Sequence, residues 1–171
     1  MTSTALEGAR LDGLAPVLSA NTRLIVLGSF PGVASLQAQQ YYGHPRNHFW
    51  PILSALWGVD LGAATYPQRL AEARRRGLGL WDVYASCRRE GSLDSAIEDT
   101  RLNDLASLRQ RAPGLRAIVH NGGESARAMA HTRALGVAVM RLPSTSPANA
   151  SWSFERKLAA WRGAFEEHGM T

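Results

Sequence analysis

The chain has 171 residues, of which 45% are hydrophobic and 19% charged, a composition that excludes a disordered protein and predicts a globular one. Its net charge of +5 and pI near 10.1 are typical of nucleic-acid-binding domains. However, only Lys157 of the 19 basic residues is a lysine, and a genome whose base composition favours arginine codons would give the same bias. One cysteine, Cys87, excludes an internal disulfide. Because the sequence has neither an apolar run near 20 residues nor a signal-peptide pattern, we expect a cytoplasmic protein without a membrane partner.

Strands and helices alternate along the chain. Short apolar runs predict four strands, at residues 24–27, 79–84, 115–120 and 137–142. Apolar periodicity and capping residues predict helices at residues 49–57, 67–76, 102–109, 124–132 and 152–168, with a short helix around residues 11–18. This order predicts an α/β fold with a parallel sheet between helices, in a single domain over residues 1–171 whose residues 1–21 are a lead-in segment.

Ligands of parallel α/β sheets bind beyond the carboxyl ends of the strands. Four polar connections leave those ends, at residues 28–47, 82–94, 121–123 and 143–150. We therefore expect a functional site where these four connections meet.

The first of these connections opens with GSFPG, residues 28–32. It lacks the Gly-Lys-Ser/Thr that completes a phosphate-binding P-loop. Its glycines permit close backbone approach and Pro31 stiffens the turn, so backbone groups there can bind an anion or a base edge, or simply form a turn. Further along, Tyr41 and Tyr42 are adjacent, and we expect one in the core and the other free to stack on a planar base for ~1–3 kcal/mol.

The same connection ends in HPRNHFW, residues 44–50. Asn47 is expected at the N-cap of the following helix, where its role is structural or functional. His44 and His48 have the spacing of a zinc pair, but Pro45 prevents them from sharing a helical turn and no third ligand is well placed. We expect no metal.

Other connections carry hydroxyls and carboxylates. The stiff stretch LPSTSPANA, residues 142–150, can donate hydrogen bonds to a phosphate backbone or can be an ordinary strand-to-helix turn. Asp82 and Asp94 can form a carboxylate pair flanking a glycosidic bond, or Asp94 can be a helix cap. Three serines, Ser29, Ser86 and Ser146, lack the nucleophile elbow of a hydrolase.

The segments GSFPG, SLQAQQYYGHPRNHFW, WDVYASCRREGSLDSAI and LPSTSPANA occur in an order that resembles the hypoxanthine-DNA glycosylase branch (family 6) of the uracil-DNA glycosylase superfamily. The resemblance covers about residues 24–150. It implies a three-layer α/β/α sandwich with a central four-stranded parallel sheet. It also implies a monofunctional, metal-free glycosylase that flips a deaminated base, hypoxanthine above all, out of DNA and hydrolyses its N-glycosidic bond for base excision repair. We expect no cofactor, and we expect a monomer because damage sites in duplex DNA lack two-fold symmetry.

The resemblance also assigns roles to residues. Phe30 occupies the position at which the superfamily usually has a catalytic Asp or Asn, and in the hypoxanthine branch the catalytic Asn corresponds to Asn47. Because an amide is no strong base, Asn47 is expected to orient water in a dissociative reaction. The backbone of Gly28, Ser29 and Phe30 would line the base pocket, and Tyr42 would stack on the base. The residues expected to contact DNA are Ser144, Thr145, Ser146, Pro147, Ala148 and Asn149, with Ser144 standing where other branches have His or Asn.

Three alternatives remain open from the sequence. The first is a uracil-DNA glycosylase of the same fold. The second is a nucleic-acid-binding module without catalysis, in which Asn47 is a helix cap and Phe30 marks a lost active site. The third is a small-molecule nucleoside or sugar hydrolase that uses Asp82 and Asp94.

Overall fold

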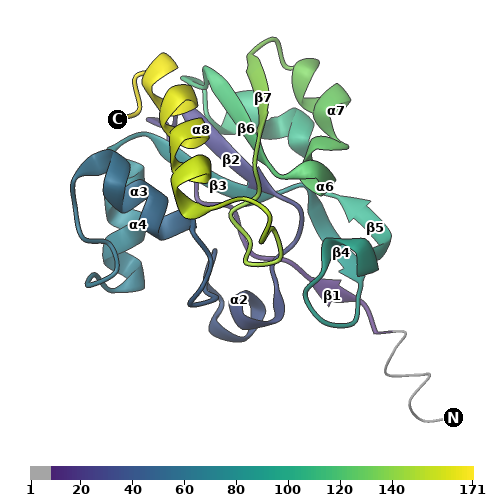
Figure 1. The fold of residues 1–171 in the computed structure, drawn as a ribbon. Coiled ribbons are helices and arrows are strands. Elements are labelled where there is room, and N and C mark those ends of the chain that lie inside the picture. Colours follow the sequence, from purple (N-terminus) through teal and green to yellow (C-terminus); the bar gives the residue numbers. More distant parts are fainter. Residues whose placement is uncertain (1–8) are drawn as a thin grey trace, which may run out of the picture.

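Four parallel strands form the central sheet of the computed structural model, which describes residues 9–171 (Figure 1). The strands are β2 (Leu24–Gly28), β3 (Leu78–Asp82), β6 (Ala117–Asn121) and β7 (Ala138–Leu142), in the spatial order β3-β2-β6-β7. Every residue of β2, β3 and β6 is buried, which explains why these strands read as continuous apolar runs. All four predicted strands are confirmed, with ends shifted by one or two residues.

Helices cover both faces of this sheet. The helices are α2 (Val33–Ala38), α3 (Phe49–Trp57), α4 (Tyr66–Arg75), α5 (Leu108–Arg111), α6 (Gly123–Ala126), α7 (Met129–Arg133) and α8 (Phe154–Glu167). Leu24 and Val26 of β2 pack into one core with residues of α3 and α8, whereas Ile25 and Leu27 pack into a second core with Leu108 of α5. Figure 1 shows α3, α4 and α8 on one side of the sheet and α6 and α7 on the other. The predicted three-layer α/β/α sandwich is therefore confirmed.

A second, smaller sheet was not predicted. It contains β1 (Leu11–Asp12), β4 (Tyr84–Arg88) and β5 (Glu98–Leu102), all antiparallel, in the order β1-β4-β5. The strand β4 follows β3 after only Val83, and its residues were read from the sequence as the end of a strand and the start of a polar connection.

The short helix predicted around residues 11–18 is wrong. Residues of this segment are extended, since Leu11–Asp12 pairs with β4 and Val17 forms an antiparallel bridge with Leu80. Gly13 and Pro16 both disfavour a helix here. Gly13 also comes close to the second core, because a Cβ at this position would lie 3.3 Å from the Phe30 ring.

Two other helical predictions need correction. Residue 102 belongs to β5, and the helical part of that segment is confined to η2 (Leu105–Ser107) and α5. The helix predicted over residues 124–132 is divided into α6 and α7, and α2 and the 3-10 turn η1 (Asp94–Ala96) were not predicted. Helices this short carry little periodicity for a sequence pattern to reveal. None of the helices in residues 9–171 combines the length and the apolar character needed to cross a membrane.

Replacing Trp161 of α8 by Ala should lower the free energy of unfolding by ~3–5 kcal/mol. Trp161 is fully buried, and its Nε1 donates to the Pro143 carbonyl oxygen at 3.0 Å, so the variant loses both packing and a loop anchor. Urea denaturation followed by circular dichroism measures the change. The exposed Glu166→Ala on the same helix should stay within ~0.5 kcal/mol, and equal effects of the two substitutions would contradict this packing.

Candidate active site

The four connections identified from the sequence meet around one cavity of about 630 Å³ beyond the carboxyl ends of β2, β3, β6 and β7. Its walls include Gly28–Gly32, Tyr41, Tyr42, His44, Asn47, Asp82, Ser92, Asp94, Asn121–Gly123 and Arg141–Asn149. The volume falls in the range of small-molecule sites. The prediction that these four connections meet is confirmed.

Gly28, the last residue of β2, leaves room for two polar side chains at the wall of this cavity. A Cβ at Gly28 would collide with the Asp82 carboxyl and would lie 3.3 Å from the Tyr42 hydroxyl. The backbone here is held by the neighbouring strand, since the carbonyl oxygens of Gly28 and Ser29 accept hydrogen bonds from the N–H groups of Val83 and Tyr84. Only glycine permits this approach.

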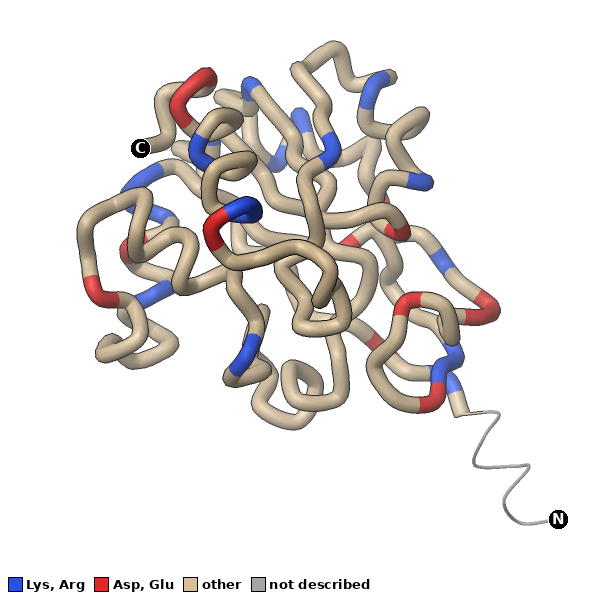
Figure 2. Tube along the Cα trace, viewed as in Figure 1, with Lys and Arg blue, Asp and Glu red and all other residues tan. Residues whose placement is uncertain are grey.

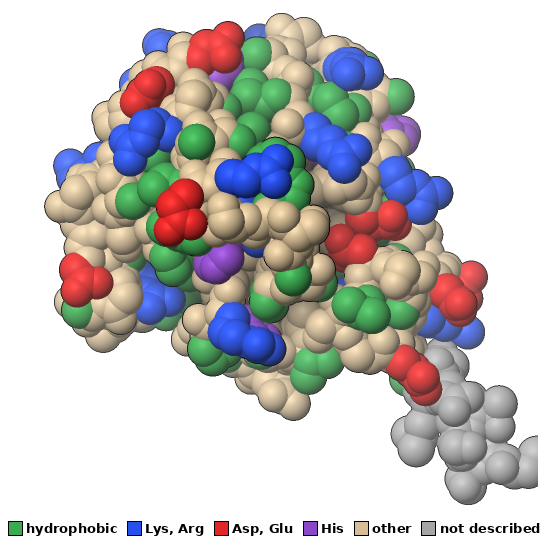
Figure 3. Space-filling view, viewed as in Figure 1, with side chains coloured by type: hydrophobic (Ala, Val, Ile, Leu, Met, Phe, Trp, Pro, Cys, Tyr) green, Lys and Arg blue, Asp and Glu red, His purple; other side chains and the backbone are tan. Residues whose placement is uncertain are grey.

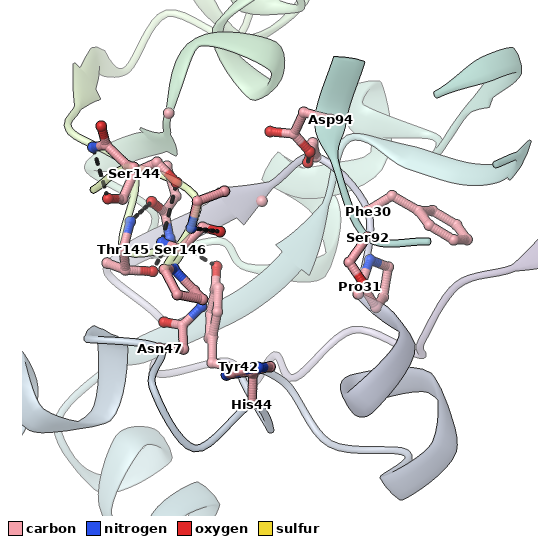
Figure 4. Close-up of a pocket in the computed structure, with 18 of the residues that line it drawn as sticks. Phe30, Pro31, Tyr42, His44, Asn47, Ser92, Asp94, Ser144, Thr145 and Ser146 are labelled. Atoms are coloured by element: carbon pink, nitrogen blue, oxygen red, sulfur yellow. Dashed lines mark hydrogen bonds between the residues drawn. The ribbon is translucent and has the colours of Figure 1, made fainter. Parts of the chain in front are cut away.

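Phe30 lines the cavity with its backbone, whereas its ring belongs to the second core and is 6% exposed. Figure 4 shows the ring turned away from Tyr42 and Asn47. The Arg89 guanidinium lies over the ring, 5.4 Å from its centroid, and donates to the Pro31 carbonyl oxygen at 2.5 Å. The GSFPG turn thus presents backbone to the cavity and buries its large side chain.

The two adjacent tyrosines have different environments. Tyr41 is 4% exposed and donates its hydroxyl to the Ala15 carbonyl oxygen at 2.8 Å, so it is the one in the core. Tyr42 lines the cavity, and its ring stacks on Phe49 with centroids 4.1 Å apart. Its hydroxyl accepts a hydrogen bond from Asn121 Nδ2 at 3.3 Å. Tyr42 has a φ of 55°, a strained value for a residue with a side chain, which turns it toward the cavity.

Asn47 lies in the cavity wall directly before α3. Its Oδ1 accepts a hydrogen bond from the Phe49 N–H at 2.9 Å, which holds the first turn of the helix. The N-cap position is occupied by His48 and not, as predicted, by Asn47. The His48 side chain makes no capping hydrogen bond, and the Asn47 side chain, one residue before the N-cap, supplies it instead. This bond occupies one lone pair of the amide oxygen, and the amide keeps further hydrogen-bonding capacity.

Thr145 anchors the loop between β7 and α8. Its side chain is fully buried, its N–H donates to Asn121 Oδ1 and its hydroxyl accepts from Asn121 Nδ2, both at 3.0 Å. Its carbonyl oxygen accepts from the His48 N–H at 3.0 Å, which ties the loop to the start of α3. The other expected DNA-contacting residues, Ser144, Ser146, Pro147, Ala148 and Asn149, line the cavity and are at least partly exposed.

Two residues of this loop anchor were missed by the sequence reasoning. Asn121 was recognised only as part of a turn, although its place at the end of a buried strand was the available signal. Lys157 is 1% exposed, and its Nζ lies 3.3 Å from both the Ser146 carbonyl oxygen and His48 Nδ1. Desolvation lowers the pKa of Lys157. No pattern in the sequence distinguishes this buried lysine from a lysine exposed to solvent.

Asp82 and Asp94 both line the cavity. Asp82 is 5% exposed, and burial together with the nearby Asp94 raises its pKa to about 7, against a smaller opposing effect of Arg89. Asp94 accepts a hydrogen bond from Ser29 Oγ at 2.6 Å, and burial raises its pKa as well. Neither carboxyl takes part in an ion pair with another residue in the described part of the chain.

One arginine lines the cavity and two more lie next to residues of its wall. Arg141, the residue before the end of β7, is exposed and lines the cavity. Arg46 is exposed and precedes Asn47 in the sequence, and Arg156 lies over the ring of Trp152, a residue of the cavity wall, at 4.1 Å. Figures 2 and 3 show Lys and Arg spread over this face among acidic residues, without one continuous basic patch.

The arginine run at the end of α4 has other partners. Arg75 and Arg76 form ion pairs with Glu72 at 2.5 and 2.6 Å. This arrangement is typical of a solvated helix end, where basic side chains interact favourably with the helix dipole.

His44 and His48 do not face a common partner. His44 Nδ1 accepts from the Arg46 N–H, whereas His48 Nδ1 faces Lys157. Among residues 9–171, no group of three or more His, Cys, Asp or Glu side chains is arranged to hold a metal ion.

Comparisons with known proteins agree with this geometry. The family model of the uracil DNA glycosylase superfamily matches residues 15–165. A hypoxanthine DNA glycosylase of Methanosarcina barkeri is 38% identical over 155 residues, which cover 91% of this chain and 98% of the relative. A hypoxanthine DNA glycosylase of Methanosarcina acetivorans is 37% identical over 153 residues, 90% of this chain and 96% of the relative.

A solved structure extends the agreement to the fold. The solution NMR structure of a candidate uracil DNA glycosylase from Methanosarcina acetivorans superposes with a TM-score of 0.85 at 35% identity, over 94% of this chain and 99% of that protein.

Replacing Asp82 by Asn should stabilise the protein more at pH 8 than at pH 5. The folded pKa of about 7 exceeds the unfolded value of about 3.9, so the folded state binds the proton more tightly and the wild-type protein loses stability as pH rises through this window. Asn does not titrate, and the stability difference between variant and wild type should therefore grow by about 2–3 kcal/mol from pH 5 to pH 8. Urea denaturation at both pH values measures it. The exposed Asp104→Asn is the control, and a difference that stays constant with pH would contradict the burial of this carboxyl.

Proposed function

We propose that this chain, which belongs to the uracil DNA glycosylase superfamily, is a monofunctional DNA glycosylase that releases hypoxanthine from deoxyinosine and leaves an abasic site for base excision repair. The substrate choice is supported by two relatives named hypoxanthine DNA glycosylase that align over most of the chain. The mechanism is supported by one observation: the Asn47 side chain lies in the cavity wall, whereas the Phe30 ring is packed in the second core.

The flipped base would occupy the cavity between the glycine turn and Tyr42. The Tyr42 ring, already stacked on Phe49, provides a rigid platform for a purine ring. Backbone groups of Gly28, Ser29 and Phe30 would contact the base edge. A base must leave the duplex to reach such a site, so the enzyme has to offset the cost of unstacking with these contacts.

Asn47 would orient the attacking water. Its amide has no basic pKa near neutrality, and the reaction is therefore dissociative. The bond from the sugar C1′ to the base nitrogen breaks with its electron pair leaving on the base, and water then adds to the oxocarbenium-like sugar. The hydrogen bond from the Phe49 N–H fixes the Asn47 side chain, and the second lone pair of Oδ1 can accept from that water.

The loop of residues 143–150 would follow the DNA backbone beside the flipped nucleotide. Ser144, Ser146 and Asn149 offer polar groups, and Pro147 and Ala148 offer a stiff apolar edge. Thr145 is buried and would contribute indirectly, because its hydrogen bonds to Asn121 hold this loop in place.

We propose a single glycosylase domain over residues 1–171 that acts as a monomer in the cytoplasm. The pairing of β1 with β4 supports including the lead-in segment in the domain, of which residues 1–8 lie outside the described structure. A damaged base pair lacks two-fold symmetry, so the substrate gives no reason for a dimer.

A second candidate substrate is uracil. The neighbouring solved structure is described as a candidate uracil DNA glycosylase, and a cavity that holds a purine also admits a pyrimidine. The two substrates are compared directly below.

Asn47→Ala should reduce release of hypoxanthine at least 100-fold, because the water loses its orienting group. Purified protein is incubated with duplexes carrying a single hypoxanthine, uracil or normal base in the presence of chelator, and abasic sites are cleaved with alkali. The wild-type protein should cleave the hypoxanthine duplex fastest. Release of uracil alone would favour the second candidate, and binding without release would indicate a non-catalytic module.

A cap control separates catalysis from folding. Asn47→Ala also removes a helix-capping bond, which costs about 1 kcal/mol. Thr65→Ala removes a comparable cap from α4, where Thr65 and Gln68 form a capping box outside the cavity. It should lower stability similarly while release of hypoxanthine stays within about twofold. Equal loss of activity in both variants would refute a role of Asn47 in the chemistry.

Arg141→Ala should weaken DNA binding for damaged and undamaged duplexes alike. Arg141 is exposed at the cavity mouth, and a phosphate contact carries no sequence information. The slope of log K against log salt should fall in magnitude by about 1. Fluorescence anisotropy at several salt concentrations measures it. The exposed Arg101→Ala on β5 is the control, and an unchanged slope for Arg141→Ala would remove it from the DNA interface.

A further inference from the structure

Asp82 has a buried polar atom that the fold leaves without a partner. The residue is 5% exposed, it lines the cavity, and its Oδ2 is inaccessible and accepts no hydrogen bond from the described residues. Buried polar atoms without a partner are rare in folded proteins, and a role in binding or catalysis is one explanation for them. The carboxyl stands at the end of β3, directly opposite Gly28 in the register of the two strands.

Burial and the acidic neighbour Asp94 favour the neutral form of the Asp82 carboxyl, against a smaller opposing effect of Arg89. Arg89 donates from Nε and Nη2 to the carbonyl oxygens of Gly91 and Pro31, and its Nη1 is buried without a partner among the described residues. Tyr41 and Tyr42 face it from the first connection, and burial raises the pKa of both, so they remain neutral as well. With its pKa raised to about 7 by burial and Asp94, Asp82 holds a proton in a substantial part of the molecules at neutral pH.

We propose that Asp82 is a catalytic residue, a general acid whose carboxyl protonates N7 of the flipped purine as the glycosidic bond breaks. This role rests on the proposed function and extends it, since it assigns the leaving-group side of the reaction to a named side chain. It divides the work between two connections of the sheet: Asp82 acts on the base and Asn47 acts on water at the sugar.

The C1′–N9 bond breaks and its electron pair passes to the base, while the Asp82 proton forms a bond to N7, so hypoxanthine departs as a neutral molecule. Asp82 is left as a carboxylate. Water adds to C1′, its proton is released to solvent, and Asp82 takes up a proton from solvent before the next turnover.

This acid also favours purines. A purine has a basic ring nitrogen, N7, beyond the glycosidic nitrogen, whereas uracil offers only carbonyl oxygens to a proton donor. A carboxylic acid at this wall of the cavity therefore assists hypoxanthine more than uracil, and the preference arises in the chemical step as well as in binding.

The test measures single-turnover release of hypoxanthine from pH 5 to pH 9 with wild type, Asp82→Asn and Asp104→Asn. The wild-type rate should fall about tenfold per pH unit above about pH 7, because the acid form is lost. Asp82→Asn should be at least 100-fold slower at pH 6 and nearly independent of pH, while its affinity for a duplex with an abasic-site analogue stays within about threefold. Asp104→Asn should follow the wild type.

A substrate change tests the contact with N7 itself. With 7-deazahypoxanthine in the duplex, which has carbon in place of N7, the wild-type rate should fall at least 100-fold and the rate of Asp82→Asn should change little further. An equal fold-loss in both proteins would overturn the proposal. An unchanged wild-type rate would overturn it as well, and this measurement does not depend on the folding of any variant.

The outcomes also separate the two proposals. A wild-type protein that releases no hypoxanthine at any pH would overturn the proposed function together with the role of Asp82. A wild-type protein that releases hypoxanthine with a flat pH profile, and with additive effects of the two changes, would overturn the role of Asp82 alone.

Discussion

The site depends on the close approach of β2 and β3 at their carboxyl ends. Gly28 lies opposite Asp82 in the parallel register, and without a Cβ it leaves room for the carboxyl and for the Tyr42 hydroxyl on the same side of the strand. A larger residue at Gly28 would push both groups out of the cavity wall. One glycine therefore sets the relative position of the base platform and the acidic group, and the connections that follow are arranged around it.

A second constraint fixes the far wall of the cavity. Asn121 bonds to Thr145 and to Tyr42, and Thr145 bonds to the backbone of His48, so β6, the 143–150 loop and the start of α3 are joined through one asparagine. Lys157 of α8 joins the same network, because its Nζ donates to the carbonyl oxygen of Ser146 in the 143–150 loop. Loop residues held in this way need little reorganisation when a substrate binds, which favours catalysis by preorganised groups.

The sequence predicted the sheet and the meeting of the four connections around one cavity, because both follow from patterns that are local and strong. Buried parallel strands are continuous apolar runs, and their carboxyl ends share one edge, so four polar connections were expected to meet there. The antiparallel sheet was not foreseen, since β1 has two residues and every residue of β5 is exposed. The roles of Asn121 and Lys157 depend on partners at least 11 residues away along the chain, which no local pattern encodes.

The role proposed for the Asp82 carboxyl would explain how a site functions with phenylalanine in the third position of its glycine turn. At Phe30 the side chain enters the second core, where Arg89 covers it, and no acidic or amide group extends from β2 toward the sugar. A buried acidic group of the cavity extends instead from the neighbouring strand, at Asp82. A buried carboxyl with its pKa raised to about 7 keeps a proton available near neutral pH, and in our proposal this group on the neighbouring strand therefore assists the departing base instead of activating water. Such assistance gains most from a leaving group with a basic ring nitrogen, and the same carboxyl destabilises the fold above neutral pH, which is the cost of keeping a titratable group in a dry cavity wall.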